Sequence, residues 1–133
     1  MDDSTPDDPT AEEVYTRGKV YMNRASKRLG VLTDGGPEDR RFRSFFGVGV
    51  VVFITAYKML LDHGLYPAEC NFQHYFWAMI FMKLYPQNEA GLCSILGGID
   101  AKTMRRGVWP IIGALALLDE FVVSAIILIL YRH

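Results

Sequence analysis

The chain has 133 residues, which suits one folded domain with a tail rather than several domains. Half of the residues are hydrophobic, so the sequence can bury a core, and a wholly disordered chain is excluded. The formal net charge is only −1, so the distribution of charge along the chain is more informative than its sum.

Residues 1–37 are expected to form a disordered arm with two kinds of charge. The first 13 residues hold six acids and no base, whereas residues 16–43 hold eight bases against three acids. An acidic tip before a basic segment is common in chains that meet nucleic acid, and it also suits a solvated tail. Residues 14–29 could form a transient helix. The breaker Thr33–Pro37 (TDGGP) marks the boundary of a helical domain over residues 38–133.

This domain is expected to be all-α, a small bundle of about five helices. Three phenylalanines at helical spacing predict a short entry helix over residues 38–46. Apolar residues recur at helical spacing over residues 47–63, although the β-branched run in this segment also suits a strand. Residues 72–85 are apolar nearly all round, which predicts a central helix.

The C-terminal third is expected to contain breaks. Pro110 falls inside a helical pattern, and a proline there removes a hydrogen bond and clashes with the preceding turn, so a kink or break is expected near Trp109. The acidic pair Asp119-Glu120 predicts a second break. The segment Phe121–Tyr131 is apolar, and its β-branched residues fit a helix or a strand. No charge-free run reaches the roughly 18–20 residues that a transmembrane helix needs.

Residues 89–112 (EAGLCSILGGIDAKTMRRGVWPII) are expected to form a helix, a tight turn and a second helix. The pair Gly97-Gly98 stops the first helix, because glycine tolerates the positive φ found at helix ends. Asp100 is a suitable N-cap for the second helix, since its carboxylate can accept from free backbone N–H groups. Four apolar residues are expected to face inward: Ile99, Met104, Val108 and Ile111.

The opposite face of this second helix is basic, which is the layout of a helix-turn-helix that enters the major groove of DNA. Arginine suits this role because its fork binds two acceptors of guanine or phosphate. The candidate DNA-binding residues are Lys102, Thr103, Arg105 and Arg106 in this helix and Arg40, Arg41 and Arg43 in the entry helix. The pattern also fits an ordinary helical corner with a solvated basic face.

Patterns typical of catalysis and metal binding are missing from the sequence. No serine–histidine–aspartate or cysteine–histidine order is evident, and no phosphate-binding loop occurs. Cys70 and Cys93 are expected to be buried free thiols, and the three histidines are isolated. We therefore expect no enzyme activity, no metal site and no cofactor.

The domain opens with Arg41-Phe42-Arg43 and Phe45-Phe46, and an apolar helix and the segment Leu96–Thr103 (LGGIDAKT) follow. In this order and spacing, residues 38–123 resemble the N-terminal helical region of Harbinger-type transposases of the DDE superfamily. The resemblance implies a DNA-binding module that acts on double-stranded DNA in the nucleus.

In that family, a catalytic domain follows the helical region, and its three carboxylates hold two metal ions. This chain stops at His133, so the resemblance implies a truncated or remnant product without transposase activity. Two alternatives stay open. One is a small membrane protein with apolar helices over residues 45–61 and 111–131, and the other is a helical protein-interaction domain. A homo-oligomer is compatible with each.

Overall fold

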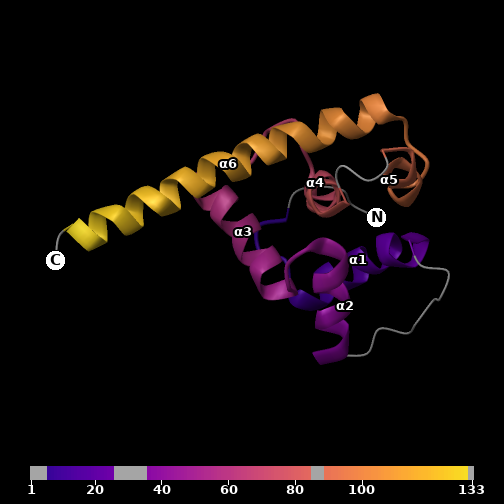
Figure 1. Ribbon diagram of the computed structural model, residues 1–133, viewed down its shortest axis with the longest axis horizontal. Coiled ribbons are helices and arrows are strands. Elements are labelled where there is room, and N and C mark those ends of the chain that lie inside the picture. Colours follow the sequence, from indigo (N-terminus) through magenta and orange to yellow (C-terminus); the bar gives the residue numbers. More distant parts are fainter. Residues whose placement is uncertain (1–5, 26–35, 85–88, 132–133) are drawn as a thin grey trace.

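The computed structural model describes residues 6–25, 36–84 and 89–131. Every regular element in these ranges is an α-helix, which confirms the all-α prediction (Figure 1). The described ranges hold six helices rather than about five. They are α1 (Ala11–Ala25), α2 (Gly36–Phe46), α3 (Val50–Asp62), α4 (Phe72–Leu84), α5 (Glu89–Ile95) and α6 (Ala101–Tyr131).

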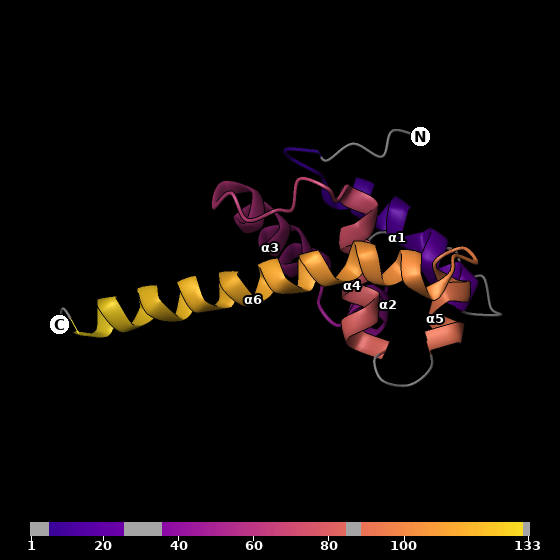
Figure 2. The ribbon, with the colours of Figure 1, turned by 90° about the horizontal axis from the view of Figure 1, so that it is seen from above.

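Helix α4 lies at the centre of the bundle. Phe72 and all residues from Tyr75 to Phe81 are buried, as expected for a helix that is apolar nearly all round. Such a helix needs neighbours on every side. Figures 1 and 2 show α6 on one side of α4 and α2 on the opposite side. The prediction of a central helix over this segment is therefore confirmed.

An aromatic cluster joins α2, α3 and α4. Phe53 of α3 is fully buried, and its ring centroid lies 5.2 Å from that of Phe42, 4.7 Å from that of Tyr75 and 4.9 Å from that of Phe76. Edge-to-face and tilted pairs of this kind add to the gain from burial. Residues 50–62 form a helix, so the strand alternative for the β-branched run is excluded.

A carboxylate sets the bend between α2 and α3. The Val50 backbone N–H, at the start of α3, donates to Asp39 Oδ1 over 3.0 Å.

No single helix among the described residues has the length and hydropathy to cross a bilayer. The segments Asp39–Phe46 and Val50–Asp62 reach them only together, as a pair bent by 55°.

Helix α1 lies within the arm that the sequence predicts to be disordered, and this prediction is wrong for residues 11–25. The buried hydrophobic residues of α1 are Val14, Tyr21 and Met22, and Gly18 on this helix is also buried. Gly18 allows α1 to approach α2 closely, because a Cβ there would lie 2.9 Å from Phe42 Cε2. The folded core therefore begins before the predicted boundary at residue 38. The expected arm residues 1–5 and 26–35 lie outside the described ranges.

Helix α6 runs without interruption, so the chain does not break at Pro110, and the break predicted at Asp119-Glu120 is wrong. Pro110 costs one helical hydrogen bond. However, Val108 and Ile111 on either side of it are fully buried, so packing holds the helix through the proline. Asp119 and Glu120 are exposed, and their charges need no break. The C-terminal part of α6 extends past the other helices (Figures 1 and 2).

Candidate nucleic-acid interface

A two-glycine turn connects α5 to α6, as predicted. Gly97 has φ +110° and Gly98 has φ +77°, both in the left-handed region that L side chains rarely adopt. The Gly97 N–H donates to the Ser94 carbonyl over 3.1 Å, and the Gly98 N–H donates to the Cys93 carbonyl over 2.9 Å. These bonds satisfy carbonyls at the end of α5 that have no partner within that helix.

Asp100 caps the N-terminus of α6, which also confirms the prediction. The Thr103 backbone N–H donates to Asp100 Oδ1 over 2.7 Å. Hydrogen bonds from the Thr103 side chain and backbone lower the pKa of this carboxyl, and the nearby cations Arg106 and Arg105 act in the same direction. The carboxylate thus fixes the point at which the helix begins.

On acidification, the Asp100→Asn variant should lose less stability than the wild type. The folded-state pKa lies below the unfolded value of about 3.9, so the carboxylate stabilises the fold above that pH. This contribution is lost as the pH falls through the folded-state pKa. We expect the melting-temperature difference between wild type and Asp100→Asn to be constant above about pH 5 and to shrink below about pH 4. The exposed Asp62→Asn serves as control. A difference that stays constant down to pH 2 would contradict the capping role.

The inward face of α6 seats this helix on α4. Met104, Val108 and Ile111 are fully buried, as predicted. Gly107 lies on the same side, and a Cβ there would lie 2.5 Å from His74 Cδ2 and 3.1 Å from Trp77 Cε3. The two helices can therefore approach this closely only because residue 107 has no side chain.

The outward face of the first two turns of α6 carries the predicted cations. The exposed polar residues are Lys102, Thr103, Arg105 and Arg106. Lys102 and Arg106 are four residues apart and share one face. Arg105 Nη1 lies 2.8 Å from Glu89 Oε1 of α5, so this arginine ties the two helices together. Trp109 is 51% exposed and extends the same outward surface.

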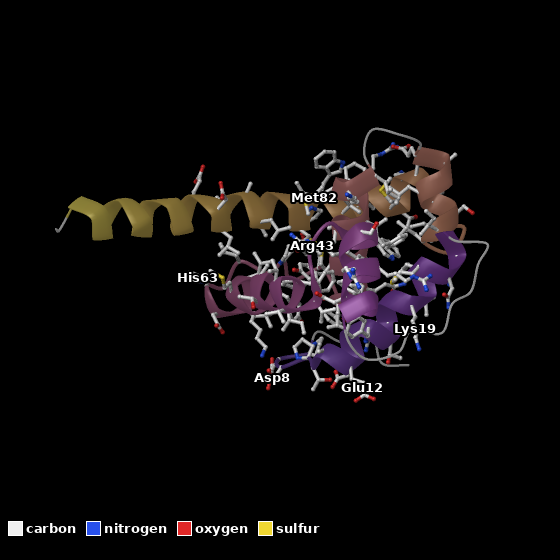
Figure 3. The ribbon with its side chains drawn as sticks, turned by 60° about the horizontal axis from the view of Figure 1, so that its bottom comes forward. Asp8, Glu12, Lys19, Arg43, His63 and Met82 are labelled. Carbon is white, nitrogen blue, oxygen red and sulfur yellow. The ribbon has the colours of Figure 1, made fainter. Side chains whose placement is uncertain are left out.

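The structure does not bring the arginines of α2 to this face. Arg40 and Arg43 are exposed and Arg41 is half-buried. All three belong to α2, which lies on the opposite side of α4 from α6 (Figures 1 and 2). Figure 3 labels Arg43 beside α2. The predicted site residues thus form two separate groups.

One cation at the turn was not among the predicted site residues. Arg24 of α1 donates from Nη1 to the Ile95 carbonyl, the last of α5, over 3.2 Å. A Cβ on Gly97 would lie 3.1 Å from the same Nη1 atom. The two partners are 71 residues apart in the sequence. No local pattern in the sequence indicates a contact over this separation.

The side chains of the described ranges that could bind a metal ion are cysteines, histidines and acids. Cys70 and Cys93 are buried thiols that form no disulfide, as predicted, and burial raises the pKa of Cys70 to about 11, away from the reactive thiolate. Within the described ranges, no three histidine, cysteine or acidic side chains gather at one point. No family model, curated protein or solved structure matches the chain significantly. The resemblance to Harbinger-type transposases therefore stays a prediction.

Proposed function

We propose that the chain binds double-stranded DNA through the first two turns of α6. The observation that carries the proposal is the exposed pair Lys102 and Arg106 on a helix that follows a tight turn and is anchored from beneath. A helix presented in this way can enter the major groove, where side chains of its N-terminal turns meet base edges and phosphates.

The charge of α6 supports this proposal. Its first 18 residues, 101–118, contain three bases and no acid, and Asp100 just before them is engaged in the cap. The chain as a whole is slightly acidic, so the basic charge on this helix is local rather than a reflection of composition. Local positive charge favours contact with the phosphate backbone.

We assign different roles to the four polar residues. Lys102 and Arg106 contact DNA directly. The Thr103 side chain and backbone N–H both donate to the Asp100 carboxylate, so Thr103 supports the cap that starts the helix. Arg105 holds α6 against α5 through Glu89, so it positions the helix. On this proposal the chain is a nuclear DNA-binding module of the kind that the Harbinger resemblance implies, and catalysis is not part of the proposal.

Replacing Lys102 and Arg106 together with alanine should weaken binding to duplex DNA more than tenfold, since two charged contacts worth on the order of 1 kcal/mol each are lost. The slope of log affinity against log salt should fall by about 1.8, since each phosphate contact contributes about 0.9. Titration of a fluorescent duplex by anisotropy across a salt series measures both quantities.

Arg40→Ala with Arg43→Ala is the matched control, because it also removes two exposed cations but from α2. We expect this variant to bind within about threefold of the wild type, an effect of net charge alone. Equal losses in both double variants, or no loss on changing α6, would overturn the assignment of the interface.

A further inference from the structure

A cavity beside the turn is the strongest feature that the proposed interface leaves unused. It has a volume of about 370 Å³ and lies between α1, α4 and the segment Gly97–Ile99. Its polar lining consists of Arg17, Arg24 and Gln73, and its apolar lining includes Tyr21, Phe76 and Leu96. Val20, which is 44% exposed, also lines it.

Each of the two guanidinium groups lies over an aromatic ring. The Arg24 guanidinium lies 5.9 Å from the ring centroid of Tyr21, and that of Arg17 lies 5.3 Å from the ring centroid of Phe72. Arg24 also donates to the Ile95 carbonyl. A guanidinium carries five donors, so one such bond leaves donors for a ligand. Cations that are already positioned lose less conformational entropy when they bind.

The charge around the cavity has one sign along α1. Residues 14–25 contain three bases and no acid, and the acids of this part of the chain come before them. Figure 3 shows Asp8 and Glu12 toward the beginning of α1 and Lys19 further along the helix. Arg17 and Arg24 are seven residues apart, which places them on one face of α1, two turns from each other.

From these observations we infer that the cavity binds a phosphate group of the DNA backbone. Two forked guanidiniums and an amide donor match the oxygens of a phosphodiester. The apolar lining can accept the adjoining deoxyribose.

The cavity lies beside the start of α6, the helix that we propose contacts DNA. Gly97 and Ile99 line the cavity, and both belong to the turn that leads into α6. Asp100, the cap of α6, follows Ile99 directly, and Lys102 is two residues further on. A phosphate held there would fix the orientation of α6 in the groove, which is the general role of backbone contacts. The inference rests on the proposed function, and it adds α1 to the interface.

Val20→Glu tests the inference, because it puts a carboxylate at the cavity without removing a described hydrogen bond. Val51→Glu is the matched control: Val51 is 75% exposed on α3, and the change in net charge is the same. We expect Val20→Glu to lose at least about fivefold in affinity for a random duplex and about 0.9 in salt slope. Val51→Glu should stay within about twofold of the wild type.

Arg17→Gln is the second variant, and it should lower the salt slope by about 0.9 while circular dichroism shows an unchanged helix content. If Val20→Glu and Arg17→Gln both bind as the wild type does, while the Lys102 and Arg106 double variant loses affinity, the cavity is not a phosphate site and the proposed function stands. If the wild type shows no binding to DNA, both proposals fail together.

Discussion

Replacing Phe53 with alanine should lower the free energy of unfolding by about 3–5 kcal/mol. Phe53 is fully buried, and rings from α2 and α4 surround it, so the substitution removes apolar contacts from three helices at once. A cavity would remain, because the surrounding rings are fixed by one another. The hydrogen bond from the Tyr75 hydroxyl to the Phe53 carbonyl, 2.6 Å long, uses the backbone and survives the change.

Chemical denaturation followed by circular dichroism measures this loss. Val51→Ala is the control, since Val51 lies two residues away on α3 and is 75% exposed. It should change the free energy of unfolding by no more than about 0.5 kcal/mol. A loss below about 1 kcal/mol for Phe53→Ala would show that α2, α3 and α4 do not share this core.

Alanine at two glycines of α6 should have opposite effects. Gly107→Ala should lower the free energy of unfolding by about 1–3 kcal/mol, because the new Cβ would overlap the His74 ring and press on Trp77. Gly113→Ala should raise it by about 0.5–1 kcal/mol, because no atom lies within 4 Å of the new Cβ and alanine favours helix.

The two variants are each other's control, because the chemical change and the helix are the same. Denaturant midpoints give both changes in the free energy of unfolding, provided that the slope of free energy against denaturant concentration is the same for each variant and the wild type. Gly107→Ala should also weaken DNA binding, since a displaced α6 would move Lys102 and Arg106 away from their contacts. Two stabilising substitutions would contradict the close approach of α6 to α4.

The sequence was sufficient for elements whose signals are local. The all-round apolar pattern of residues 72–85 predicted the central helix, and α4 lies there over Phe72–Leu84. Gly97-Gly98 and Asp100 predicted a turn and a cap, and both have the expected geometry, because backbone conformation at these positions depends on the residue itself.

The sequence was not sufficient to predict elements whose structure depends on contacts with distant residues. The charges of residues 11–25 favoured disorder, but the partner that stabilises α1 is an aromatic surface that is formed by residues of later helices. The rule for proline favoured a kink or break near Trp109. The helix does not break there, because burial on both sides of Pro110 outweighs one lost hydrogen bond.

The candidate site shows the same division. The exposed cations of α6 followed from helical spacing alone. Arg24, however, reaches the turn from 71 residues away, and no local pattern could connect them. The arginines of α2 were predicted as DNA-binding residues together with the cations of α6. The fold puts them on the other side of α4 from α6.

The most direct test of the claim that α6 contacts DNA is a nuclear magnetic resonance titration of the whole ¹⁵N-labelled chain with a short random duplex. Amide shifts report contact residue by residue and do not depend on a substitution. We predict that the largest shifts fall within residues 97–109, with a second group around Arg17 and Arg24 of α1. Shifts confined to α2 and α3, or no shifts with the duplex in excess, would contradict a DNA-binding role for α6.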